Sequence, residues 1–85
     1  MPARIIKTTG AIVEVGPANG KHFQLEELQA IVGGYIEVVR LPDGQLMFAN
    51  EDGLSQGLPF NSLASSYYRA KIVGDVLITS DDLVE

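Results

Sequence analysis

The residues best suited to chemistry stand together at Asn50, Glu51 and Asp52, directly after a β-rich segment. Their carboxylate and amide oxygens could hold a cation, orient the hydroxyl groups of a ligand, or act as general acid and base. The stretch lacks the alternating acidic positions and the distal glutamate of an EF-hand, which argues against calcium. Because Gly53 follows, the same residues could instead form a turn in which Asn50 bonds local amides. The sequence leaves both interpretations open.

Further polar and aromatic side chains complete a candidate ligand-binding set. Tyr35 and Glu37 alternate along a predicted strand and so point the same way, where a ring could stack on a planar ligand and a carboxylate could accept its N–H. Asn61 is placed either as a helix N-cap or as a ligand contact. Arg69 could neutralise an anionic group. The predicted ligand-binding residues are Tyr35, Glu37, Asn50, Glu51, Asn61 and Arg69.

The chain has few residues suited to catalysis or to metal binding. His22 is the only histidine and there is no cysteine, so a metal site of thiolates or imidazoles has no ligand set. A nucleophilic serine needs a positioned base, and the sole imidazole has no motif around it. We therefore expect no catalytic residue, no metal and no cofactor. The weaker alternative is a carboxylate-dependent hydrolase that uses Glu37, Glu51 or Asp75.

The length and the charge of the chain limit the number of domains and the kinds of partner that we expect. A chain of 85 residues has room for one core, so we expect a single domain over residues 1–85. Eleven acidic residues stand against six basic ones, the net charge is −5, and the basic residues form no run, which argues against nucleic-acid binding. No apolar stretch approaches the roughly 18 residues that a membrane span requires, so we expect a cytoplasmic protein without membrane contact.

The elements that must position these residues follow from the apolar pattern. We predict β-rich runs at residues 4–7, 11–15, 35–41, 45–50 and 71–79, and helices at residues 23–32 and 62–70. The first helix ends at Gly33, where a glycine can adopt the αL conformation. The sequence Pro42-Asp43-Gly44 between two strands is the strongest hairpin signal. The tail, residues 80–85, is predicted to be frayed.

This order predicts an α+β domain, a mostly antiparallel sheet of about five strands with two short helices on one face. On the first helix, Leu25, Leu28, Ile31 and Val32 form one apolar stripe. If both helices cover one face, apolar residues on the other face, such as Ile12 or Val38, need a second cover. A symmetric partner could provide it.

Several spaced segments, “GGYIE”, “NEDG”, “LPFN” and “GD”, resemble a family of small proteins that is widespread in bacteriophages, plasmids and bacterial genomes. The family is known as domain of unknown function 3846, and the resemblance runs from about Leu25 to Ile78. It implies a cytoplasmic α+β protein that is often carried by mobile elements. It implies no established reaction.

We expect a non-enzymatic binding protein that forms a homo-oligomer, because so short a chain cannot easily enclose a pocket and also fill a core, whereas several subunits can share the pocket walls. By analogy with small acidic phage proteins that sequester the nucleotide signals of bacterial immunity, the expected ligand is nucleotide-like. The alternative from another class is an inhibitor or adaptor that binds a host enzyme through a sheet edge or an acidic face.

Overall fold

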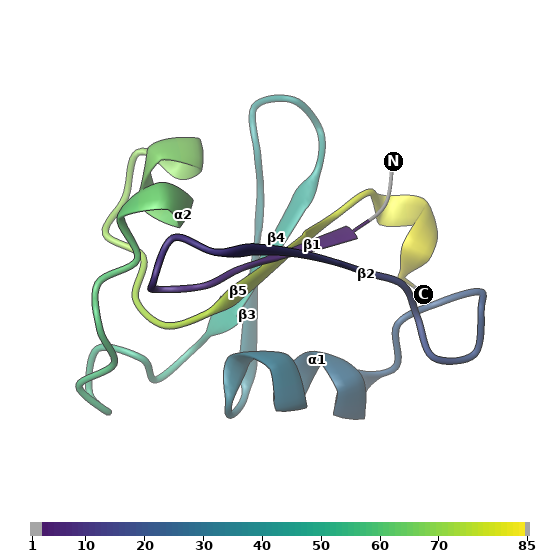
Figure 1. Cartoon of the computed structure of the whole chain (residues 1–85), viewed down its shortest axis with the longest axis horizontal. Coiled ribbons are helices and arrows are strands. Elements are labelled where there is room, and N and C mark those ends of the chain that lie inside the picture. The colour runs from purple at the N-terminus through teal and green to yellow at the C-terminus, as the bar shows by residue number, and fades with distance from the viewer. Residues whose placement is uncertain (1–2, 85) are drawn as a thin grey trace.

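Five short strands, spread along the chain, form one antiparallel sheet in the computed structural model, which describes residues 3–84 (Figure 1). The strands are β1 (Ala3–Ile6), β2 (Ile12–Val15), β3 (Ile36–Arg40), β4 (Leu46–Asn50) and β5 (Val76–Thr79). Their order across the sheet is β2-β1-β5-β4-β3, and each neighbouring pair is antiparallel. The central strand is therefore β5, and β2 and β3 are the two edges. The predicted α+β class, with an antiparallel sheet of five strands and two helices, is confirmed.

Tight turns with glycine in the left-handed region close both hairpins. Between β1 and β2, the backbone N–H of Lys7 donates to the carbonyl oxygen of Ala11 at 2.9 Å. Between β3 and β4, the backbone N–H of Leu41 donates to the carbonyl oxygen of Gln45 at 2.7 Å, and Gly44 has φ +91°. A residue with a Cβ is disfavoured at that φ, which explains why the Pro-Asp-Gly signal located this hairpin.

The two α-helices are short and end at identifiable signals. The first, α1 (Leu25–Val32), ends at Gly33, which has φ +82° and donates its N–H to the carbonyl oxygen of Gln29. The second, α2 (Ser62–Tyr68), begins at the N-cap Asn61, and a 3₁₀ turn η1 (Asp81–Leu83) follows β5. Within residues 3–84, no helix has both the length and the apolar character that crossing a membrane requires.

The helices lie on opposite faces of the sheet, which corrects the expectation that both cover one face (Figure 1). Along β4, Met47 and Ala49 belong to the core under α2, whereas Leu46 and Phe48 belong to the core under α1. All five side chains of β4 and all four of β5 are buried. Strands with apolar side chains on both faces need a cover on both, and one helix covers each face.

The two cores take side chains from opposite faces of the same strands, β1, β4 and β5, and each includes one of the two helices. The core on the α2 face consists of Ile6, Leu41, Met47, Ala49, Ala64, Ile72, Val76 and Ile78. The core on the α1 face consists of Ala3, Phe23, Leu28, Leu46, Phe48 and Leu77. The central strand contributes to both, so it ties the two layers together.

The C-terminal segment is docked as far as the structure describes it, contrary to the predicted fraying. The backbone N–H of Phe23 donates to the carbonyl oxygen of Leu83 at 2.8 Å, and Phe23 and Val84 form a parallel bridge. Leu83 and Val84 are half-buried and pack against the core on the α1 face. Apolar contact and a backbone hydrogen bond thus order residues 81–84, while Glu85 lies outside the described residues.

Candidate functional site

Three of the predicted ligand-binding residues come together in one small recess. Glu37, Asn50 and Glu51 line it on the α2 face of the sheet, together with Ala49, Leu54, Lys71, Ile72 and Val73, and we call it the Glu37 recess. Its volume is about 60 Å³. Pockets for small molecules usually measure about 300–1,000 Å³, so this recess is too small to enclose a nucleotide.

The other predicted residues lie elsewhere. Tyr35 is 69% exposed and lines a shallow surface recess with Gln29, Gly34, Asp52 and Gln56. Arg69 is exposed at the αL C-cap of α2, with φ +57°, and does not line the Glu37 recess. The six predicted residues therefore do not converge on one pocket.

Asn61 is a structural residue with every polar side-chain atom engaged. Its side chain is 1% exposed, and its Oδ1 accepts from the backbone N–H of Ala64 at 3.0 Å, which confirms the N-cap interpretation. Its Nδ2 donates to the carbonyl oxygens of Ile6 and Gly74, both at 2.9 Å. The side chain thus joins the start of α2 to β1 and to the segment before β5, and no donor remains for a ligand.

Asn50 also holds the fold together. It is 4% exposed, and its Nδ2 donates to the carbonyl oxygen of Val32 and to Oε1 of Gln56, both at 3.1 Å. Its Oδ1 accepts from the backbone N–H of Asp52 at 2.8 Å, and its carbonyl oxygen accepts from Gly53. These bonds are those of a turn that also anchors the end of α1, while the side chains of Glu51 and Asp52 are exposed.

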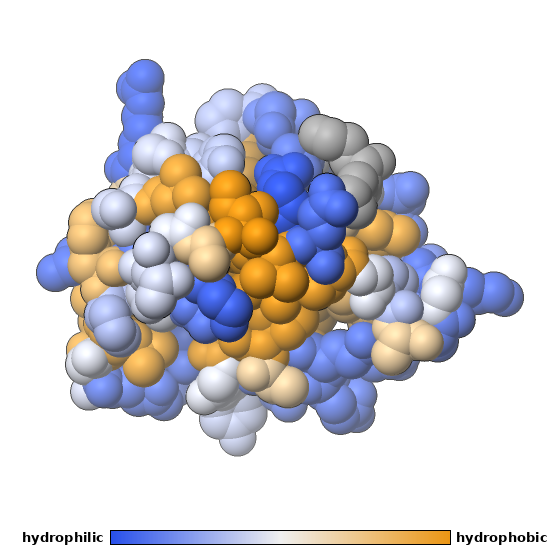
Figure 2. Space-filling model, viewed as in Figure 1, coloured by the Kyte–Doolittle hydropathy of each residue, from blue (hydrophilic) through white to orange (hydrophobic). Residues whose placement is uncertain are grey.

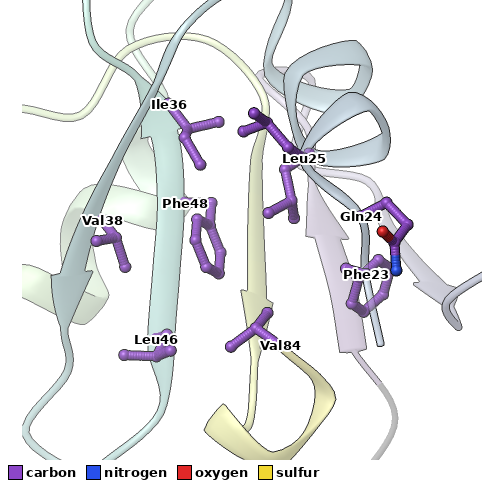
Figure 3. A pocket seen from close by; sticks show the side chains of 9 residues that line it. Phe23, Gln24, Leu25, Ile36, Val38, Leu46, Phe48 and Val84 are labelled. Carbon is purple, nitrogen blue, oxygen red and sulfur yellow. The ribbon is translucent and has the colours of Figure 1, made fainter. Parts of the chain in front are cut away.

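A larger, apolar cavity lies on the α1 face, beside the edge strand β3 (Figure 3). We call it the β3 groove, and its volume is about 440 Å³. Val38, Phe48 and Leu25 point into it from β3, β4 and the start of α1, and Val84 lies at its other end (Figure 3). The lining residues are Phe23, Gln24, Leu25, Leu28, Ile36, Val38, Leu46, Phe48 and Val84.

The groove exists because α1 packs mainly across β4 and β5 and less across β3. Leu28 and Val32 are buried under the helix, but Leu25, the first helical residue, is 54% exposed at the groove wall. Val38 is 52% exposed on the facing strand, and the ring of Phe48 is almost fully buried between them. The sequence contained one signal for this site, since Val38 was predicted to need a cover.

The strand that forms the outer wall of the groove has backbone groups with no partner among residues 3–84. Hydrogen-bonded and non-hydrogen-bonded pairs alternate along an antiparallel ladder. Leu41 bonds to Gln45 and Tyr35 bonds to Glu51, so the odd-numbered residues of β3 bond to β4. The N–H and C=O groups of the alternate residues therefore point away from the sheet, and these residues are Ile36, Val38 and Arg40.

The opposite edge of the sheet is β2, which exposes Ile12 and Val13. Apolar side chains form a band across this side of the molecule, over β1 and β2 and down towards α1 (Figure 2). Ile12 and Val13 point to opposite faces of the sheet, because side chains alternate along a strand. Neither residue lines the β3 groove, so apolar exposure at β2 is separate from that cavity.

Charged groups with shifted pKa values lie outside the groove. The backbone N–H and the side-chain amide of Gln45 both donate to the carboxylate of Asp43 and lower its pKa below 3.8. A hydrogen bond from Ser80 lowers the pKa of Asp82 in the same way. Within residues 3–84, no three His, Cys, Asp or Glu side chains lie together in a group that could hold a metal ion.

Comparison with known families extends the resemblance seen in the sequence. The family profile of Domain of unknown function (DUF3846) matches residues 4–84, which include both helices and every residue that lines the β3 groove. Neither the curated proteins nor the solved structures gave a match. Because the family profile covers nearly the whole sequence, this chain belongs to the DUF3846 family.

Proposed function

We propose that this protein is a non-catalytic adaptor or inhibitor that binds an extended segment of a partner protein in the β3 groove. The observation that carries the proposal is the position of an apolar cavity of about 440 Å³ next to a strand whose outer N–H and C=O groups are unpaired. Strand addition to a sheet edge takes its affinity from such backbone groups and its specificity from pockets for alternate side chains.

An extended polypeptide fits both parts of this surface. Its backbone would pair with Ile36, Val38 and Arg40, and its alternate side chains would enter the groove. A fatty chain would fill the groove but leave the strand edge without partners. Gln24 is the only polar residue among the nine that line the groove, so a phosphate would find no cation there. The nucleotide-like ligand therefore stays a sequence-based prediction, and the groove favours a polypeptide.

A direct test is an NMR titration of the protein with a short peptide in which valine alternates with glutamine. We expect backbone amide shifts at Ile36, Val38 and Arg40, together with methyl shifts of Leu25 and Val84. Oleate is the comparison ligand. Groove methyl shifts with oleate and none with the peptide would overturn the proposal, and so would peptide shifts confined to β2.

The Val38→Pro variant removes one outward N–H while leaving the hydrogen bonds between β3 and β4 intact. We expect it to weaken peptide binding at least tenfold. The variant loses one backbone hydrogen bond to the added strand, and its side chain forms a smaller part of the groove wall than that of Val38. Circular dichroism and the β4 amide shifts report whether the fold is kept.

A second variant tests the apolar wall without touching the strand. Leu25→Gln changes a groove residue that is 54% exposed, so the fold is little affected. The matched control is Leu54→Gln, which changes a leucine that is 67% exposed and does not line the groove. Peptide affinity should fall for the first and stay unchanged for the second. Equal effects would contradict a role for the groove.

The predicted homo-oligomer is a separate question for the same edge, because a second copy could also pair along β3. Sedimentation of the protein and of Val38→Pro distinguishes the two occupants. We expect Val38→Pro to change peptide binding without changing the sedimenting mass. If a dimer dissociates in this variant and no peptide binds the parent protein, a second copy replaces the partner segment as the occupant of β3.

A further inference from the structure

We propose that the partner segment alternates apolar residues with basic ones, an inference that rests on the proposed function. An added strand has two faces, and the β3 groove receives only one of them. Its other side chains would lie over the α2 face of β3, beside Glu37 and Val39. The side chains on the α2 face of β3 therefore determine which residues of the partner segment alternate with the apolar ones.

Glu37 is the residue that an added strand would meet on the α2 face. It pairs with Ala49, whose side chain belongs to the core under α2, so Glu37 points to that side. Its side chain is exposed. A residue directly opposite on a neighbouring strand has its Cβ about 4.5–5.5 Å away, within reach of a lysine or arginine.

Glu51 adds a second carboxylate to the same Glu37 recess. The salt bridges of the described residues join Lys7 to Asp75 and Arg40 to Asp81, so neither Glu37 nor Glu51 takes part in one. Lys71 also lines the recess and offsets one of the two negative charges. The recess thus keeps a local excess of negative charge, in a chain whose net charge is −5.

A basic side chain on the partner complements this surface on the face away from the groove. On the groove face, Arg40 is bound to the carbonyl oxygen of Gly44 at 2.9 Å and lies 3.7 Å from the carboxylate of Asp81. Positions opposite Ile36 and Val38 meet walls that are apolar apart from Gln24. The matching segment is therefore apolar where it faces Ile36 and Val38, and basic where it faces Glu37.

The test compares three short peptides of equal length, in which valine alternates with lysine, with glutamine or with glutamate. At low salt we expect the lysine peptide to bind about two- to fivefold more tightly than the glutamine peptide, as cross-strand charge pairs typically give. The glutamate peptide should bind more weakly than both. The preference should shrink at high salt, because exposed charges are screened.

Variants assign the preference to specific residues. Glu37→Gln should remove most of the lysine preference, whereas Glu14→Gln makes the same charge change on the far edge strand β2 and should leave it unchanged. Lys71→Gln removes the competing cation and should increase the lysine preference. A Glu14→Gln effect equal to that of Glu37→Gln would show a response to net charge alone and overturn the inference.

The outcomes also separate this inference from the proposed function. If all three peptides shift the amides of Ile36, Val38 and Arg40 with equal affinity, strand addition stands and the basic pattern is wrong. If none of the peptides shifts these amides, the proposed function itself is wrong, and the inference falls with it.

Discussion

The side-chain amide of Asn61 donates to the backbone carbonyl of Ile6 at 2.9 Å, between residues 55 positions apart in the sequence. The same amide group reaches Gly74, and the side-chain oxygen caps α2. One side chain therefore fixes α2 against β1 and against the segment that leads into β5. A local capping signal in the sequence turns out to be a junction of three distant parts of the chain.

Replacing Asn61 separates these roles. Asn61→Ala loses the cap and removes the side-chain donor to the carbonyl oxygens of Ile6 and Gly74, so we expect a loss of about 2–4 kcal/mol in the free energy of unfolding. Asn61→Ser keeps an acceptor for the cap but loses the two donations, so its stability should fall between those of Asn61→Ala and the parent. Urea unfolding measures both variants. A serine variant as stable as the parent would show that the two long-range bonds contribute nothing.

Asn50→Asp tests the anchor at the end of α1. The new carboxylate keeps the acceptor for the N–H of Asp52 but loses the donations to Val32 and Gln56. The second carboxylate oxygen would be buried beside the oxygens of Val32 and Gln56 with no donor in place of Nδ2, so we expect a loss of about 2–4 kcal/mol near neutral pH.

Burial and nearby oxygens should raise the folded-state pKa of the new carboxyl group above its unfolded value. The folded state then binds the proton more tightly, so stability should recover as the pH falls through that raised pKa and towards the unfolded value of about 3.9. Urea midpoints of the variant and of the parent, measured over this pH range, test whether the stability difference shrinks as the pH falls. If the stability difference between Asn50→Asp and the parent protein grew as the pH fell, the anchoring role of Asn50 would be contradicted.

Gly53 follows the acidic stretch, and a side chain there would meet a rigid neighbour. A Cβ at Gly53 would lie 2.7 Å from Cγ2 of Val73 and 3.3 Å from the carbonyl oxygen of Asn50. Val73 is buried and β-branched, so it cannot easily rotate away. We expect Gly53→Ala to lower the free energy of unfolding by about 1–3 kcal/mol, measured by urea unfolding.

Gly16→Ala is the matched control for Gly53→Ala. A Cβ at Gly16 has nothing within 4 Å, and its φ is not in the left-handed region. The same substitution reduces the entropy of the unfolded chain at both sites. Gly16→Ala should therefore be neutral or stabilising by up to about 1 kcal/mol. Equal effects at both positions would rule out the contact with Val73 as the cause.

The turn between β3 and β4 should respond to acid. Hydrogen bonds from Gln45 stabilise the carboxylate of Asp43 and lower its pKa below 3.8. A lowered folded-state pKa means that this stabilisation is complete above about pH 3.8 and is lost as the pH falls through the lower value. A carbon-13 NMR titration of the Asp43 carboxyl should show a midpoint below 3.8. Asp43→Asn should abolish the accompanying shift of the Gln45 amide.

Local signals in the sequence predicted the elements well. Pro42-Asp43-Gly44 identified the hairpin because few residues other than glycine tolerate the φ at Gly44. Gly33 marked the end of α1 for the same reason. These features depend on the conformation of a few consecutive residues, so they can be predicted without knowledge of the tertiary structure.

Features that depend on distant segments were missed. The face on which α2 packs follows from the register of β4 and β5, where Met47 pairs with Ile78 and Phe48 with Leu77. The β3 groove depends on how far α1 reaches across the sheet. The hydrogen bonds of Asn61 to backbone carbonyls of remote residues depend on the tertiary structure in the same way. The apolar run of β5 was a usable sign that both faces are covered.

The sheet has two open edges, β2 and β3, at its opposite ends. Copies with two unlike open edges can stack head to tail into a fibre that has no natural end. A strand seated on β3 would leave each molecule with one reactive edge, and stacking would then stop at a pair. Occupancy of β3 would therefore also keep the protein from polymerising.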